Sequence, residues 1–475
     1  MSELWFKPAY ELAEAIRSRR LSPVELMEAS YDRIEEANPV LNAFNALRPR
    51  EESVADARAL EKRIAAGEDV GILAGLPFGV KELEDAEGFP STHASVPYKD
   101  EYPEQDSTQV ERLKKADAII IGKTNSPEFG YTAFTKNLLF GITRNPWNPE
   151  RTPGGSSGGT SAAIASGMVP IATGSDGGGS VRIPACYTGC FGLKPSFGRI
   201  PKGPFEMLGW NDTSVYGPIT RTVRDGALFM DAVVGAHGAD PDSLPHPGYR
   251  YTDVMEESPG KLRIAWSPTL GLARVQNDVL REVTAGVKVF EKLGHEVEEI
   301  DKVFEEMGRI WMRVSGTETF AKVVEKIEDH REEFGYSFLK GVEASGKTTF
   351  EKYGKAQRAR AKLVNELWRL FEKYDALLTP TLPTEAFDAR GRWPEEINGE
   401  KIENPLMAVV FTYPFNLSGH PAANVRAGLT DAGLPCGLQI VAARHREDRI
   451  FQLARAYEQE RPWNDAWPKG VPAAV

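Results

Sequence analysis

Short apolar runs recur from one end of this chain to the other, and they constrain its fold more than any other feature. Runs of this length and composition are typical of strands that are buried on both faces of a sheet. We predict strands at residues 77–81, 118–122, 262–266, 375–380, 408–417 and 436–442. Because they occur in both halves of the chain, they favour one interleaved sheet over separate modules.

Helical segments alternate with these runs. Ser22-Pro-Val-Glu25 is a capping box with proline at the first helical position, and we expect the helix that follows to stop at Pro39. Further helices are predicted at residues 53–67, 107–113 and 279–290 (closed by Gly294), and over 302–373 with an interruption near 341–347. The alternation predicts an α/β fold with a central mixed, mostly buried β-sheet covered by helices.

We expect one large domain, residues 1–475, which is divided into four parts by their helices and strands. The parts are N-terminal helices (1–70), a core of strands and helices (71–222), a helical insert region (262–380), and strands and a helix that complete the core (405–460).

Composition restricts the class of protein. The formal charge of −11 over 475 residues argues against nucleic acid as a partner, because phosphate binding needs a basic face. No apolar run is long enough for a membrane span, and the first ten residues lack the layout of a signal peptide. The three cysteines, Cys186, Cys190 and Cys436, indicate a reducing compartment, so we expect a soluble, cytoplasmic protein. Each is expected to be a small buried hydrophobe, and no nearby histidine supports a metal site.

Candidate chemistry is concentrated between Pro153 and Ile200. Pro-Gly-Gly-Ser-Ser-Gly-Gly-Thr begins at Pro153, and Gly-Ser-Asp-Gly-Gly-Gly-Ser-Val-Arg begins at Gly174. Glycine within structure costs conformational entropy, so a fold that keeps this many is using them. We infer that backbone N–H groups approach a reacting atom near Ser156 and Ser180.

Two local interpretations of this stretch are weak. A phosphate-binding P-loop needs lysine and then serine or threonine after its last glycine, but Thr160 and Ser161 follow Gly159. A dinucleotide-binding fingerprint is also absent, because Gly177-Gly-Gly179 is not followed by a further glycine at the required spacing. Gly-Gly-Ser156-Ser-Gly matches a nucleophile elbow, but the preceding residues 144–153 are rich in proline and asparagine instead of forming a strand.

A longer series of motifs resembles the amidase signature family, which are serine hydrolases that act on amide C–N bonds. The motifs are Gly79-Val-Lys81, Gly122-Lys-Thr-Asn125 with Glu128-Phe129, Thr143-Arg-Asn-Pro-Trp147, Pro153-Gly-Gly-Ser-Ser-Gly-Gly159, Gly174-Ser-Asp-Gly-Gly-Gly-Ser-Val-Arg-Ile-Pro184 and Gly192-Leu-Lys-Pro195. Weaker stretches lie at 414–419 and 433–439. The resemblance implies the amidase signature fold, a small-molecule amide substrate, no cofactor or metal, and a monomer or homodimer.

The resemblance also implies a Ser–cis-Ser–Lys catalytic unit, with Ser180 as nucleophile, Ser156 as the bridging serine and Lys81 as the base. A serine hydroxyl is a poor nucleophile until a base removes its proton. A lysine can act as that base only when it is neutral, and burial favours the neutral form. The carboxylates at positions 82, 84 and 85 would instead favour the charged form of Lys81.

The residues around the two serines are expected to support them. Consecutive N–H groups of Gly177, Gly178, Gly179 and Ser180 are predicted to form an oxyanion hole. Ser157, Asp176 and Arg182 are predicted to support it, the last two as an ion pair.

The substrate class is predicted from one position and a set of aromatic residues. The glutamine-hydrolysing subunit of tRNA-dependent amidotransferases has an acidic residue where this chain has Val409, so we expect an uncharged carboxamide, with carbamates and esters as further substrates. Predicted pocket residues are Phe129, Tyr131, Phe134, Phe205, Met207 and Trp210, with Trp311 and Met312 in the insert. A non-catalytic binding protein on the same fold and the glutamine-hydrolysing subunit of an amidotransferase remain alternatives.

Overall fold

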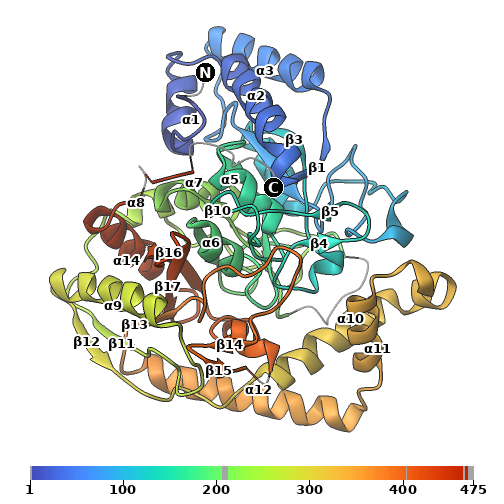
Figure 1. Ribbon diagram of the computed structural model, residues 1–475. Coiled ribbons are helices and arrows are strands. Elements are labelled where there is room, and N and C mark those ends of the chain that lie inside the picture. Colours follow the sequence, from blue (N-terminus) through green and yellow to red (C-terminus); the bar gives the residue numbers. More distant parts are fainter. Residues whose placement is uncertain (1–2, 206–211, 403, 464–465, 469–475) are drawn as a thin grey trace.

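A mixed sheet of eleven strands forms the centre of the molecule (Figure 1). The computed structural model describes residues 3–205, 212–402, 404–463 and 466–468. Strands from both halves of the chain meet in the order β1-β3-β2-β6-β10-β8-β16-β17-β13-β11-β12. The predicted α/β fold with a central mixed sheet is confirmed.

The strands of this sheet are short, and the central ones are fully buried. They are β1 (Phe44–Leu47), β2 (Pro77–Lys81), β3 (Ile119–Thr124), β6 (Ile171–Ala172), β8 (Phe191–Lys194), β10 (Ile219–Thr220), β11 (Arg263–Trp266), β12 (Glu296–Glu299), β13 (Ala376–Pro380), β16 (Ala422–Leu429) and β17 (Pro435–Ala442). The strand β2 pairs in parallel with β3 and β6, whereas each of β8, β16, β17 and β13 runs antiparallel to its neighbour in that series. Every residue of β2, β3, β13 and β17 is buried, which explains why their sequences are mostly apolar.

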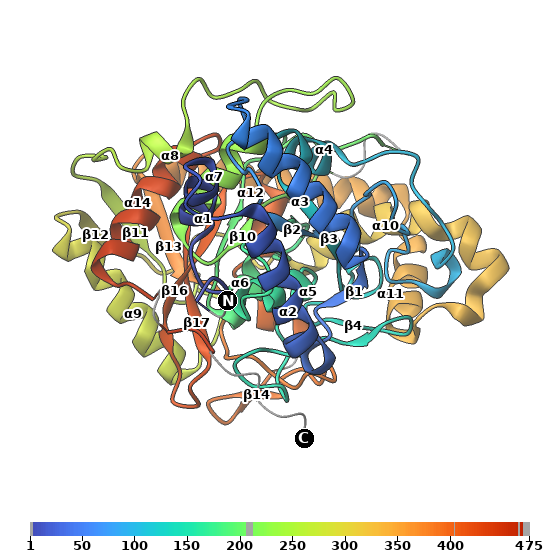
Figure 2. The ribbon, with the colours of Figure 1, turned by 90° about the horizontal axis from the view of Figure 1, so that it is seen from above.

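Helices cover the sheet. They are α1 (Ala9–Arg17), α2 (Pro23–Leu41), α3 (Arg50–Ala65), α4 (Thr108–Lys115), α5 (Gly158–Ala165), α6 (Arg182–Thr188), α7 (Val223–Val233), α8 (Tyr251–Val254), α9 (Asn277–Lys292), α10 (Gly308–His330), α11 (Tyr336–Gly346), α12 (Phe350–Phe371), α13 (Tyr413–Leu417) and α14 (Glu447–Glu460). Helices α10 and α11 lie on one side of the molecule, and α9 with β12 lies on the opposite side (Figure 2). All residues of α5 and α6 are buried.

The first long helix keeps its predicted start but not its predicted end. The capping box at Ser22 forms, with proline at the first helical position. The helix α2 does not stop at Pro39 but continues to Leu41, and Asn42 ends it in the left-handed conformation with φ 49°. A proline in the last turn forfeits only its own N–H bond, so the helix can contain it.

The predicted interruption of the insert near residues 341–347 is only partly right. Helix α11 continues through Gly341 to Gly346, and the breaks lie at 331–335 and 347–349. A Cβ on Gly341 would lie 1.9 Å from the Tyr131 hydroxyl, and one on Gly346 would lie 2.6 Å from the Phe320 ring. These glycines therefore admit aromatic side chains and do not break the helix.

Near the C-terminus one predicted strand is wrong and one strand is not predicted. The segment 408–417 forms no strand; it contains the end of the 3₁₀ helix η4 (Pro405–Val409) and the whole of α13. A short buried helix and a buried strand share the same apolar pattern, and a proline occupies one of the first two positions of each of these helices. The unpredicted strand β16 contains Asn424 and Arg426, whose buried polar groups interrupt its apolar pattern.

The three cysteines are buried and form no disulfide. Among the described residues, no group of three or more His, Cys, Asp or Glu side chains could hold a metal ion. In the same part of the chain, no helix has the length and apolar character that crossing a membrane requires.

Candidate active site

Two glycine-rich loops bring Ser156 and Ser180 together. Ser156 follows a cis peptide bond from Gly155 and lies just before the buried helix α5. Ser180 occupies a turn just before α6. The backbone N–H of Ser157 donates to the carbonyl oxygen of Ser180 over 3.2 Å, so the two loops lie side by side.

The third predicted residue, Lys81, ends strand β2 beneath these loops. Its Nζ atom lies 2.8 Å from Oγ of Ser156 and 2.9 Å from Oγ of Ser175. Lys81 is fully buried and Ser156 nearly so, whereas Ser180 is partly exposed. The base candidate is therefore shielded from water, and the nucleophile candidate is open to a substrate.

Burial lowers the pKa of Lys81 to about 7, against the opposing charges of Asp176 and Glu84. The carboxylates that follow Lys81 in sequence form hydrogen bonds with other residues. Glu82 accepts hydrogen bonds from Thr92 and Asn45, and Glu84 accepts them from Ser107 and Gln109. The desolvation of Lys81 thus outweighs the acidic residues that follow it in sequence.

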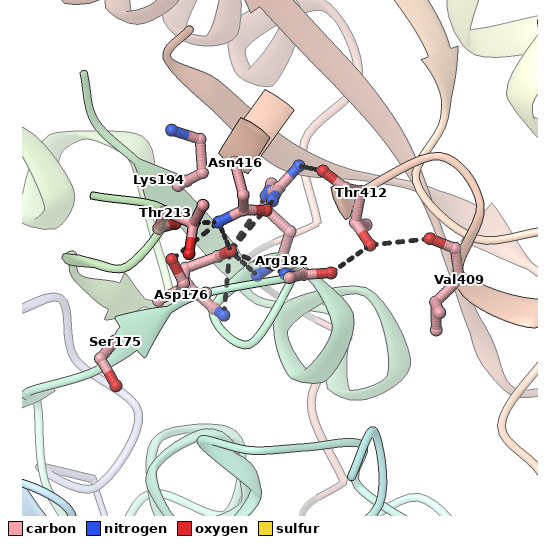
Figure 3. A network of polar contacts seen from close by, with 12 residues as sticks. Ser175, Asp176, Arg182, Lys194, Thr213, Val409, Thr412 and Asn416 are labelled. Carbon is pink, nitrogen blue, oxygen red and sulfur yellow. Dashed lines mark hydrogen bonds and ion pairs between the residues drawn. The ribbon is translucent and has the colours of Figure 1, made fainter. Parts of the chain in front are cut away.

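A second buried lysine, Lys194 in β8, also has its pKa lowered to about 7 by burial. Its Nζ donates to the carbonyl oxygen of Pro195 over 2.9 Å and points away from Asp176 (Figure 3). Among the described residues it makes no hydrogen bond to either serine. Geometry therefore distinguishes Lys81 from Lys194 as the base candidate.

A buried polar network holds the loop that carries Ser180 (Figure 3). Arg182 and Asp176 form an ion pair of 2.9 Å, and neither side chain is exposed. The other guanidinium contacts are Thr412 O, Gln439 Oε1 and Asn416 Oδ1, at 2.9, 2.8 and 2.7 Å. Burial would raise the pKa of Asp176, but the Arg182 charge and hydrogen bonds hold it below its usual range.

Asn416 and Gln439 were not among the predicted site residues. Asn416 Nδ2 donates to the backbone and side chain of Asp176 over 2.8 and 2.9 Å. Gln439 contacts Arg182 from strand β17. The signal for both lay in the weaker family-like stretches at 414–419 and 433–439, although neither stretch indicates its partner.

We predict that Asp176→Asn destabilises the protein by about 3–5 kcal/mol, because it leaves the Arg182 charge buried and unpaired. The free energy of urea unfolding measures this. The matched control is Asp388→Asn, whose partner Arg390 is 56% exposed and whose loss should leave the free energy of unfolding nearly unchanged. Equal effects of the two changes would contradict a buried network.

Because the folded pKa of Asp176 lies below its unfolded value, its contribution to stability is present above about pH 4 and disappears as the pH falls through the folded pKa.

One predicted oxyanion donor is already occupied. The N–H of Gly179 donates to Oδ1 of Asp176 over 2.7 Å. Within the described ranges, the N–H groups of Gly177, Gly178 and Ser180 have no hydrogen-bond partner. The donors available to a substrate are therefore these three, and Gly179 serves the fold of the loop.

The predicted pocket residues do not form one surface. Phe129 stacks on Phe338 with ring centroids 5.1 Å apart, and Tyr131 meets the edge of the same ring. Gly130 lies between them, and a Cβ on it would lie 3.0 Å from Oγ of Ser156. These two aromatic residues therefore flank a glycine that lies next to Ser156.

The other predicted pocket residues have different positions. Phe134 packs against Phe387 and Trp393 in a separate aromatic cluster. Phe205 is partly exposed. Met207 and Trp210 lie outside the described residues. The insert residue Trp311 covers the glycine loop directly, because a Cβ on Gly178 would lie 2.4 Å from its ring.

A family of known proteins matches the chain that carries this mixed sheet, the buried lysine and the paired serines. The family model described as Amidase matches residues 25–451. The chain belongs to the amidase signature family.

Relatives with different named activities are similar over nearly the whole chain. An acylamidase of Rhodococcus erythropolis is 37% identical over 97% of this chain and 96% of its own length. One subunit of the glutamyl-tRNA(Gln) amidotransferase of Geobacillus kaustophilus is 34% identical over 96% of this chain and 98% of its own. The solved structure of a bacterial aryl acylamidase has a TM-score of 0.92 at 34% identity and covers 99% of this chain and 100% of its own.

Proposed function

We propose that this protein hydrolyses uncharged carboxamides through an acyl-enzyme formed on Ser180. The observation that carries the proposal is the contact between Lys81 and Ser156. A buried lysine whose pKa is lowered to about 7 lies 2.8 Å from a serine hydroxyl, next to the loop of a second, accessible serine. A base near neutrality is matched to proton transfer at ordinary pH.

The proposed reaction has two halves. Oγ of Ser180 attacks the carbonyl carbon of the amide, its proton passes to Ser156, and the proton of Ser156 passes to neutral Lys81. The resulting oxyanion accepts N–H groups of the glycine loop. When the C–N bond breaks, the relay returns a proton to the leaving amine. Water then attacks the acyl–Ser180 ester in the same way, which releases the carboxylic acid and restores the serine.

An apolar surface beside the loop supports an uncharged substrate. Val409 is buried and its carbonyl oxygen accepts a hydrogen bond from the backbone N–H of Thr412, whose hydroxyl donates to the Gly178 oxygen (Figure 3). Trp311 and Tyr413 stack with ring centroids 5.8 Å apart on the same side of the loop. An isolated ammonium or carboxylate would be costly against such a surface. Aryl and alkyl amides fit it best, as the names of two relatives also suggest.

A hydrolysis screen tests this substrate class. The panel contains anilides, small aliphatic amides, aryl carbamates, aryl esters and glutamine, and the measured quantity is kcat/KM for each. We expect anilides or aliphatic amides to be cleaved by the protein alone, with glutamine hydrolysis at least about 100-fold slower, because an unpaired charge in an apolar site costs several kcal/mol.

The main alternative to this substrate class is glutamine hydrolysis within an amidotransferase, because one relative is a subunit of such an enzyme. If glutamine were the preferred substrate, or if hydrolysis required ATP and a partner protein, the amidotransferase function would replace the proposal. If no member of the panel were cleaved and Ser180 resisted acylating reagents, a non-catalytic role would replace it.

A further inference from the structure

Every backbone carbonyl group of the loop from Ser175 to Ser180 is held by a donor outside the loop. Lys81 holds that of Ser175, Asn416 that of Asp176, Ile183 N that of Gly179 and Ser157 N that of Ser180. The two carbonyls in the middle are held by side chains of distant elements. Nε1 of Trp311 donates to the Gly177 oxygen over 2.8 Å, and Oγ1 of Thr412 donates to the Gly178 oxygen over 2.6 Å.

The orientation of a carbonyl determines that of the N–H in the same peptide. The peptide bonds on both sides of Gly178 are trans, since the cis bonds among the described residues are Gly155–Ser156 and Gly203–Pro204. In a planar trans peptide the C=O and N–H point in opposite directions. By holding the Gly177 carbonyl, Trp311 therefore turns the Gly178 N–H away from itself, where it has no partner in the described part of the chain.

We propose that Trp311 and Thr412 are positioning residues of the oxyanion hole. Trp311 holds the peptide that carries the Gly178 N–H, and Thr412 holds the next peptide, whose Gly179 N–H donates to Asp176, so that the Gly178 N–H is preorganised for the developing oxyanion. This inference rests on the proposed acyl transfer to Ser180. It assigns to the insert helix α10 a role in the rate of the reaction as well as in the pocket wall.

Further contacts make the Trp311 arrangement rigid. Its ring lies against Gly178, where any Cβ would clash. The Tyr413 ring stacks on it at an interplanar angle of 22°, and the Tyr413 hydroxyl donates to Glu306 over 2.8 Å. Thr412 is fully buried. A glycine loop has little stiffness of its own, so these side chains supply the rigidity that oxyanion stabilisation needs.

The test compares Trp311→Phe with the wild-type enzyme on one anilide and on the matching aryl ester. The change keeps an aromatic ring but removes the N–H that holds Gly177. We expect kcat to fall roughly 10- to 100-fold, as for small displacements of catalytic groups, and to fall equally for amide and ester. We expect KM to change little, because phenylalanine keeps an aromatic ring at this place in the pocket wall, and the pH midpoint of kcat/KM to stay unchanged, because Lys81 is not altered.

Thr412 provides a second, independent pair of variants. Thr412→Val removes the hydroxyl and should lower kcat with the same pattern, whereas Thr412→Ser keeps the hydroxyl and should restore most of the activity. The matched control is Trp5→Phe, since Nε1 of Trp5 also donates to a carbonyl, that of Ala29, over 2.9 Å. We expect it to leave kcat unchanged.

Three results would overturn the positioning role: kcat of Trp311→Phe within twofold of wild type, a loss confined to KM, or Thr412→Ser as impaired as Thr412→Val. If Trp311→Phe failed to fold, the Thr412 pair would decide. Failure of the proposed function would look different, because wild-type enzyme would then cleave neither the anilide nor the ester.

Discussion

Ser180→Ala will abolish amide hydrolysis, with a loss in kcat on the order of 10⁶-fold, as seen when a serine hydrolase loses its nucleophile. The residual rate will come from binding and the N–H donors alone. The fold should be retained, because Ser180 is partly exposed and the hydrogen bond from Ser157 reaches only its backbone oxygen. Steady-state hydrolysis of an anilide measures the effect.

The control for Ser180 is another hydroxyl in the same loop region. Ser157→Ala removes a side chain whose hydroxyl only contacts the Ser175 carbonyl over 3.4 Å, and its loss should reduce kcat far less. Activity of Ser180→Ala above one-thousandth of wild type would identify a different nucleophile.

Lys81→Ala will impair amide cleavage by about 10⁴-fold, the upper range for loss of a general acid–base group. An aryl ester will be affected much less, because a phenolate departs without the proton that an amine must receive. The ratio of the two effects is the measured quantity. It separates the proton relay from the oxyanion hole, whose loss affects both substrates alike.

The pH dependence follows from the same residue. Since burial lowers the pKa of Lys81 to about 7, the neutral, active form predominates above that pH. We expect kcat/KM for an anilide to rise through a midpoint near 7 and to lose about tenfold per unit below it. A profile that stays flat from pH 5 to 9 would exclude Lys81 as the titrating base.

The elements around Lys81 and the serines could be predicted from sequence because their signals are local. The strand β2 has the predicted bounds, Pro77–Lys81, since a fully buried strand is a continuous apolar run. The contact of its last residue with Ser156 was expected only through the family resemblance. Nothing in the spacing of two residues this far apart in sequence indicates that they meet.

The parts that could not be predicted depend on long-range contacts. Asn416 and Trp311 reach the loop around Gly177 from distant segments, and neither has a local pattern that names its partner. The sequence of residues 408–417 predicts a strand where the structure has helices, because buried helices and strands share apolar runs. The use of Gly179 by Asp176 likewise depends on the turn geometry of the folded loop.

The central claim is that Ser180 becomes covalently acylated, and intact-protein mass spectrometry after reaction with a serine-directed aryl phosphonate tests it most directly. Peptide mapping locates the adduct, and Ser180→Ala and Lys81→Ala are treated in parallel. We predict a single phosphonyl group on Ser180 in the wild-type protein, slower labelling of Lys81→Ala and none of Ser180→Ala. An adduct on another residue, or equal labelling of Ser180→Ala, would contradict the account.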